Sequence, residues 1–283
     1  MQDPTLYQYP DYPEMKPDFT VDQAYDHYTA EDHAVWQALY TRQMSLIGGA
    51  ACREYAEGAR NLKLAEDRIP RFDELSEALY RTTGWELAAV PGLIPDDVFF
   101  NHLANKVFPV TRWIRPREKL DYLQEPDLFH DLFGHVPLLM HPVFSDYLAM
   151  FGRGGNRALR IGSTRALEQI SRLYWYTVEF GLIKNPEGLR IYGAGILSSA
   201  GEVEYSLNSP KPNRLGFQLE RIMRTNYRID DYQESYWVIE SFDQLYEATL
   251  QDFKPIYAEL EHTTSIAAGD ILPSDQVIHR GQK

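Results

Sequence analysis

The 283-residue sequence has one cysteine, Cys52, so no disulfide can form within the chain. A single thiol also cannot build a zinc site of several cysteines, and such low cysteine content is typical of a reducing compartment. The first residues, Met1–Thr5, contain neither a basic segment nor an apolar run, which excludes the pattern of a secretory signal. No stretch approaches the ~20 apolar residues of a membrane span. We therefore expect a cytoplasmic protein that does not bind membranes.

Positive charge is also scarce: 28 Lys and Arg stand against 41 Asp and Glu, a formal net charge of −13. Binding to nucleic acid needs a basic face that neutralises phosphates, so we expect no nucleic-acid partner. An anionic membrane surface is disfavoured for the same reason. Aromatic residues, in contrast, make up 13% of the chain and include 19 Tyr, which hints at a packed interior and an aromatic ligand.

Helical spacing of apolar residues dominates the chain, and no alternation of strand, helix and strand is evident. The spacing, together with Ser, Thr, Pro and acidic residues at helix starts, predicts helices from Thr29 to Gly48, at 52–62, at 72–83, after Pro95, after Pro126, after Pro142, from Ser163 to Glu179, at 215–224 and at 242–253. Alternation predicts a β-hairpin from 189–192 and 203–207 and a strand at 236–239.

This pattern predicts a mainly α protein with one catalytic domain of packed helices and a small β-hairpin or sheet. Residues 1–28, rich in Tyr and Pro, are expected to form an N-terminal arm, with Tyr7, Tyr9 and Tyr12 against the body. The catalytic domain should span residues 29–262. Residues 263–283 lose the pattern, so we expect a frayed C-terminal tail.

Two histidines five residues apart, His130 and His135, and one glutamate further along, Glu179, form a candidate metal site. Two imidazoles and a carboxylate can occupy one face of a metal ion and leave other positions open, which suits ferrous iron. Five residues of an ideal α-helix turn through about 140°, so the histidines would share a metal only at a distorted helix end, which Gly134 and Pro137 permit. Taken singly, each of these residues is more often structural, so on spacing alone hydrogen-bonded core histidines and a helix-capping glutamate are favoured.

Three segments carry a family resemblance. They are EPDLFHDLFGHVP at 125–137, LYWYTVEFGL at 173–182, and YGAGILSS at 192–199 with Gly201 and Glu202 after it. In order and spacing, over roughly residues 70–250, the chain resembles the pterin-dependent aromatic amino acid hydroxylases. This resemblance implies the fold of that family and His130, His135 and Glu179 as iron ligands.

The resemblance also implies roles for residues around the metal. It implies catalytic roles for Tyr174 and Asp131. At the position of Asp131 the family commonly has glutamate. The residues implied for pterin binding are Gly92, Leu93, Ile94, Phe99, Asp131 and Tyr174. Those implied for substrate binding are Arg115, Pro126, Asp127, Trp175, Phe180, Gly195, Ser198 and Ser199. Arginine suits this task because its planar fork can hold a carboxylate by two hydrogen bonds.

The activity that the resemblance implies is conversion of L-phenylalanine to L-tyrosine with O2 and a tetrahydropterin (tetrahydrobiopterin or a bacterial analogue) at a mononuclear non-haem Fe(II). Hydroxylation of tyrosine or tryptophan is the alternative. Ile229 falls where tyrosine-specific members tend to carry an acid, and an apolar wall there would favour phenylalanine. The chain is too short for the regulatory domain of animal members and has no heptad-patterned C-terminal helix, so we expect a monomer.

Two other classes remain open on the residues alone. A zinc hydrolase could use the same three ligands, although the chain lacks the H-E-x-x-H pattern and Asp131 would have to act as its base. A protein that binds an aromatic ligand without catalysis is the other alternative. Metal analysis distinguishes the first, and pterin oxidation coupled to phenylalanine turnover distinguishes the second.

Overall fold

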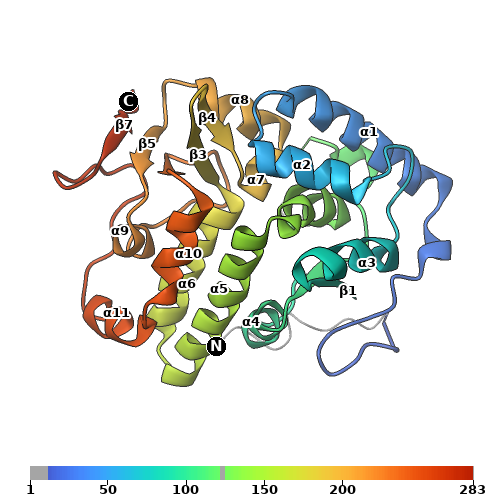
Figure 1. Cartoon of the computed structure of the whole chain (residues 1–283), viewed down its shortest axis with the longest axis horizontal. Helices are drawn as coiled ribbons and strands as arrows, with labels where there is room; N and C mark the ends of the chain where they lie inside the picture. The colour runs from blue at the N-terminus through green and yellow to red at the C-terminus, as the bar shows by residue number, and fades with distance from the viewer. Residues whose placement is uncertain (1–11, 122–124, 283) are drawn as a thin grey trace.

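The computed structural model describes residues 12–121 and 125–282, and this part of the chain is mainly helical (Figure 1). Its α-helices are α1 (Ala30–Ile47), α2 (Arg53–Leu62), α3 (Phe72–Thr83), α4 (Asp96–Ala104), α5 (Pro142–Ile161), α6 (Thr164–Tyr174), α7 (Ala194–Leu197), α8 (Ala200–Asn208), α9 (Leu219–Met223), α10 (Phe242–Leu250) and α11 (Phe253–Leu260). Short 3₁₀ turns lie at Tyr25–His27, Arg117–Lys119 and Val136–Met140. Two segments are π-helices, η4 (His130–His135) and η6 (Trp175–Glu179). None of the described helices is long and apolar enough to cross a bilayer.

Strands in the described ranges form two small sheets. In the first, β1 (Glu86–Val90) pairs in parallel with β2 (Val107–Thr111), and α4 connects them. The second has the order β4-β3-β6-β5-β7 and contains β3 (Gly181–Asn185), β4 (Gly188–Ile191), β5 (Asn213–Gly216), β6 (Ser235–Ile239) and β7 (Val277–His279). Strand β6 runs parallel to both of its neighbours, and the outer pairs are antiparallel. The expectation of no strand–helix–strand unit was therefore wrong, since β1, α4 and β2 form one.

The predicted hairpin was also wrong in one strand. Residues 203–207 are helical in α8, because the hydroxyl of Ser199 accepts a hydrogen bond from the backbone N–H of Glu202 and starts a helix there. The true partner of β4 is β3, on its N-terminal side. The predicted helix at 215–224 is strand β5 followed by α9, and the one at 242–253 is divided into α10 and α11.

Helix α5 runs through the middle of the molecule and carries much of the core (Figure 1). Its contact with α4 is close because α5 has glycine where the helices cross. A Cβ atom on Gly155 would lie 2.2 Å from Cδ1 of Phe100, and one on Gly152 would lie 2.5 Å from the backbone nitrogen of Ala104. Any larger residue at these positions would push the helices apart.

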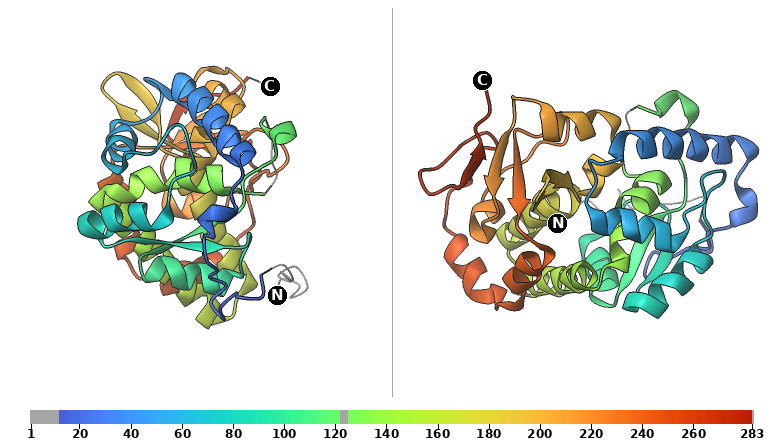
Figure 2. Two further views of the ribbon diagram at one scale, coloured as in Figure 1. Left: turned by 90° about the vertical axis from the view of Figure 1, so that its right-hand side faces the viewer. Right: turned by 45° about the horizontal axis from the view of Figure 1, so that its top comes forward.

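Both ends of the described chain contact other segments, and the C-terminal strand β7 lies at the edge of the molecule (Figure 2). Of the expected N-terminal arm, Tyr7 and Tyr9 fall outside the described residues, while the backbone N–H of Val21 donates to the carbonyl of Ala89. Residues 263–282 do not show the fraying that we expected. They contribute β7, and the carboxylate of Asp275 accepts from Nε of Arg221 at 3.0 Å in a fully buried ion pair. The spacing of apolar residues does not reveal polar contacts of this kind, so it did not predict that this segment is ordered.

Candidate metal and active site

The two candidate histidine ligands lie at the two ends of π-helix η4. Hydrogen bonds in a π-helix join residue i to residue i+5, so residues five apart lie about one turn from each other. The Nε2 atoms of His130 and His135 are accordingly 3.1 Å apart. We expected a distortion confined to the end near Gly134 and Pro137; instead the whole segment is π-helical. Gly134 serves a different purpose, because a Cβ there would lie 2.9 Å from the carbonyl oxygen of Ala194 in α7.

The third candidate ligand, Glu179, ends the second π-helix, η6. Here the backbone N–H of Phe180 donates to the carbonyl of Trp175, five residues back, at 2.9 Å. One carboxylate oxygen of Glu179 lies 3.1 Å from Nε2 of His135, and the other lies 3.5 Å from Nε2 of His130. Three side chains from two segments, about 45 residues apart in sequence, therefore converge on one point.

The charges of the three side chains favour binding of a cation between them. Burial would raise the pKa of Glu179, but His135 and His130 outweigh burial and hold it well below its usual range. Burial disfavours charged His130, yet the charge of Glu179 prevails and raises the pKa of His130. Two imidazole Nε2 atoms at 3.1 Å direct lone pairs at each other unless a proton or a metal lies between them. The donor set thus fits a divalent metal.

The tautomer of His130 is set by Ser198. Nδ1 of His130 lies 2.9 Å from Oγ of Ser198, and that hydroxyl donates to the carbonyl of Ala194 at 2.8 Å. The hydroxyl oxygen is then an acceptor toward Nδ1–H, so Nε2 keeps its lone pair for a metal. The sequence resemblance places Ser198 among substrate-binding residues; the hydrogen bond gives it a contact with the metal site as well.

Asp131 also lies at the cluster, since it, His130 and His135 offer ligand atoms within 4.8 Å of one another. One of its oxygens accepts the backbone N–H of Thr111 at 2.7 Å, and burial raises its pKa against the opposing effect of the histidines. Glu179 is the better third ligand, because both of its oxygens face histidine Nε2 atoms. Asp131 instead ties η4 to the end of β2, a contact through Thr111 that sequence reasoning missed.

Ring contacts connect the implied pterin residues to the metal cluster. Phe99 on α4 meets Tyr174 edge to face at 5.7 Å between ring centroids, and Tyr174 lies 6.2 Å from the ring of His135. Burial and the nearby charge of Glu179 raise the pKa of Tyr174 well above its usual range, so its phenol stays protonated. The loop containing Gly92 and Ile94 follows the end of β1.

Arg115 and Asp127 form a buried ion pair. Nε and one terminal nitrogen of Arg115 donate to the two carboxylate oxygens of Asp127 at 2.9 and 2.8 Å. The side chains are 7% and 0% exposed. Pro126, half-buried, directly precedes this carboxylate.

Trp175 and Phe180, the implied aromatic wall, lie 4.7 Å apart between ring centroids. Gly195 allows this wall to form, since a Cβ there would lie 2.9 Å from Cζ of Phe180. Ser199 is occupied as the N-cap of α8. The argument from Ile229 was wrong in its physical basis, because its side chain is 61% exposed and cannot wall a buried ring.

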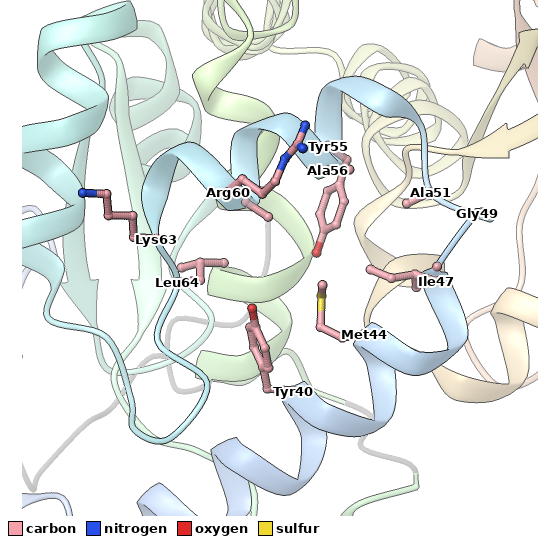
Figure 3. Close-up of a pocket in the computed structure, with 12 residues that line it drawn as sticks. Tyr40, Met44, Ile47, Gly49, Ala51, Tyr55, Ala56, Arg60, Lys63 and Leu64 are labelled. Atoms are coloured by element: carbon pink, nitrogen blue, oxygen red, sulfur yellow. The ribbon is translucent and has the colours of Figure 1, made fainter.

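A cleft of about 420 Å³ lies elsewhere, between α1 and α2 (Figure 3). It is lined mainly by apolar side chains, among them Tyr40, Met44 and Tyr55. Tyr55 passes from this cleft to η4, where its hydroxyl donates to the carbonyl of Phe133 at 2.7 Å. We place the chemistry at the histidines rather than in this cleft, because the described residues that line the cleft include no His, Cys, Asp or Glu.

Comparison with known proteins agrees with this geometry. The model of the biopterin-dependent aromatic amino acid hydroxylase family matches residues 20–267. A phenylalanine-4-hydroxylase of Chromobacterium violaceum is 57% identical over 94% of this chain and 89% of its own length. One from Ralstonia nicotianae is 54% identical over 95% and 85%.

Solved structures give the same result. A crystal structure of the C. violaceum enzyme with bound iron(III) and oxidised cofactor 7,8-dihydrobiopterin is similar to this chain with a TM-score of 0.89, at 57% identity over 92% of this chain and 93% of that one. Another, with oxidised Fe(III), has a TM-score of 0.90 and 58% identity over 92% and 94%. The chain belongs to the biopterin-dependent aromatic amino acid hydroxylases.

Proposed function

We propose that this chain is a monooxygenase that converts L-phenylalanine to L-tyrosine, using O2, a tetrahydropterin and a mononuclear non-haem Fe(II). The observation that carries the proposal is the convergence of His130, His135 and Glu179 at 3.1–3.5 Å. Relatives more than half identical over nearly the whole chain are phenylalanine-4-hydroxylases, which favours phenylalanine over tyrosine or tryptophan as substrate.

His130, His135 and Glu179 would hold Fe(II), and this set of two imidazoles and one carboxylate is typical of iron sites that bind exchangeable ligands. When bound, Fe(II) and tetrahydropterin supply the activation of O2 and the electrons that a monooxygenase needs. Ser198 keeps His130 in the metal-binding tautomer, and Asp131 holds η4 against β2. Each of these contacts fixes the metal site before the substrates arrive.

Substrate and pterin are positioned by the surrounding side chains. We assign the substrate carboxylate to Arg115, whose guanidinium Asp127 holds in one orientation. The substrate ring packs on Trp175 and Phe180. The pterin ring stacks on Phe99, with backbone groups near Gly92, Leu93 and Ile94 at its polar edge.

Tyr174 acts as a hydrogen-bond donor in this arrangement. Its phenol lies beside Glu179 and remains neutral because its pKa is raised. It can therefore orient the carboxylate without adding charge to the site. The proposed reaction requires no strong general base from the protein.

We also propose that the predicted catalytic domain, 29–262, extends through residues 263–282, which add β7 to its sheet, that the arm at 1–28 precedes it, and that the protein works as a cytoplasmic monomer. One connected hydrophobic core over the described residues supports one catalytic domain. The lone cysteine, Cys52, is buried, in keeping with a protein that needs no disulfide.

The test is tyrosine formation by metal-stripped protein resupplied with Fe(II), L-phenylalanine, tetrahydrobiopterin and ¹⁸O2. We expect ¹⁸O in the tyrosine hydroxyl and no product when iron, pterin or oxygen is omitted or when zinc replaces iron. Product formed without pterin, or with oxygen from water, would overturn the proposal. Competition among phenylalanine, tyrosine and tryptophan then decides the substrate.

A further inference from the structure

The indole of Trp175 contacts two aromatic rings and forms a hydrogen bond through its nitrogen, all with groups outside the metal cluster. Its ring lies 4.4 Å from that of Tyr227 with an angle of 17° between the planes, and Phe180 is 4.7 Å away at 34°. Its Nε1–H donates to Oε1 of Gln233 at 2.9 Å. Rotation of the indole would break this hydrogen bond and the stacking together.

Gln233 can make this contact in only one amide orientation. It is 1% exposed, and its Nε2 donates to the backbone carbonyl of Arg228 at 2.8 Å. Reversal of the amide would place NH2 against the indole N–H and oxygen against a carbonyl oxygen, two repulsive pairs. The acceptor is therefore fixed toward Trp175.

The segment 226–234 that carries Gln233 is itself anchored. Just past the segment, the hydroxyl of Tyr236 donates to the buried carboxylate of Glu202 on α8. Tyr232 stacks on Tyr205 at 4.5 Å and 14°. At the other end of the segment, the carbonyl of Asn226 accepts from the hydroxyl of Tyr176 at 2.5 Å. The segment is thus a support that joins α8 to η6, the π-helix that ends in Glu179.

We propose that Gln233 is a positioning residue that fixes the plane of the Trp175 indole and thereby sets the affinity for the aromatic ring of the substrate. The proposal rests on the proposed function, which makes Trp175 part of the ring-binding wall. Gln233 does not touch the reacting atoms; it acts through Trp175. Its effect should consequently disappear when Trp175 loses its N–H.

A double-mutant cycle with Gln233→Met and Trp175→Phe tests this dependence. Methionine keeps the length of glutamine, but its thioether sulfur is only a weak acceptor for the indole N–H. Gln233→Met should raise KM for phenylalanine roughly tenfold, the factor that 1.4 kcal/mol represents, with a smaller change in kcat. In the Trp175→Phe background it should change KM by less than about twofold. An equal effect in both backgrounds would overturn the proposal, because Gln233 would then be acting only as general support.

A second readout does not depend on catalysis. The chain has five tryptophans, and Trp175→Phe identifies the indole N–H signal of Trp175 in an ¹⁵N-labelled NMR spectrum. In Gln233→Met that signal should move upfield, and an unmoved signal would refute the contact. If the wild-type protein made no tyrosine, the function would fail while this measurement still reported on the Gln233–Trp175 bond.

Gln169→Met is the matched control. Gln169 is fully buried and its Nε2 donates to the carbonyl of Leu260 at 3.0 Å, away from the aromatic wall. It should lower thermal stability but leave KM and the Trp175 signal unchanged; a change in both would show that any buried glutamine has this effect. Gln233→Asn, one carbon too short to reach both partners, should reproduce the KM and NMR changes and replaces the methionine variant if that one does not fold.

Discussion

The buried pair of Arg115 and Asp127 should be responsible for both stability and substrate binding, and the two effects can be separated. The carboxylate of Asp127 accepts four hydrogen bonds: two from the guanidinium, one from the backbone N–H of Arg115 and one from that of His130. Asp127→Leu leaves the cation buried without a counter-ion. Removing one partner of a buried pair costs about 3–5 kcal/mol.

For a protein of this size, each kcal/mol lowers Tm by about 2–4 °C, so Asp127→Leu should lower it by roughly 6–20 °C. The double variant Arg115→Met with Asp127→Leu removes both charges and should recover part of that loss. Recovery stays incomplete because two backbone N–H groups still lack their acceptor. Thermal unfolding of the metal-free proteins measures these differences.

Between these two variants, phenylalanine binding should follow the opposite order from stability. The double variant is more stable than Asp127→Leu yet has no guanidinium, so calorimetry should detect no phenylalanine binding to it. Two results would refute the reasoning. A loss below about 1 kcal/mol in Asp127→Leu would mean that Arg115 finds another partner. Wild-type affinity in the double variant would remove Arg115 from the substrate site.

Further predictions concern the metal, the pterin and pH. His130→Ala, His135→Ala and Glu179→Ala should each abolish stoichiometric iron binding, measured by metal analysis after dialysis; full iron content in all three would exclude this ligand set. Phe99→Ala should weaken pterin binding by at least about 0.5–1.5 kcal/mol, the value of aromatic stacking, and phenylalanine binding much less, both by calorimetry. Burial raises the pKa of Glu202 to about 7, so the folded protein keeps a proton that the unfolded chain releases. This stabilisation is complete below the unfolded pKa and is lost as pH rises through 7. Glu202→Gln should therefore unfold with a flatter pH dependence between pH 5 and 8, and parallel curves for the two proteins would contradict the shift.

Local signals in the sequence were sufficient for most helix boundaries. The hydroxyl of Thr29 accepts from the backbone N–H of Asp32, and the carboxylate of Asp32 accepts from the backbone N–H of Thr29, which is the predicted start of α1. Gly84, with φ 76°, ends α3 where predicted. These contacts span four residues or fewer, so the chain specifies them without help from distant segments.

Contacts between distant segments could not be predicted in the same way. Val203, Tyr205 and Leu207 alternate like a strand, but Val203 and Leu207 are also one helical turn apart; apolar spacing did not decide between the two patterns, and the N-cap at Ser199 marks the helix. Gln233 reaches Trp175 across 58 residues of sequence. No local pattern distinguishes a glutamine that orients an indole from one exposed to solvent.

The metal site itself shows where the reasoning from spacing fell short. A spacing of five was treated as unfavourable because an α-helix turns such residues to different faces. The chain uses the same spacing twice, between His130 and His135 in η4 and between Tyr174 and Glu179 around η6. In a π-helix, five residues complete about one turn, so each pair meets on one side. π-Helical turns are rare and cost stability, and they occur frequently at functional sites. Two polar pairs at a spacing of five, in segments that otherwise read as helices, are therefore evidence for a site rather than against one.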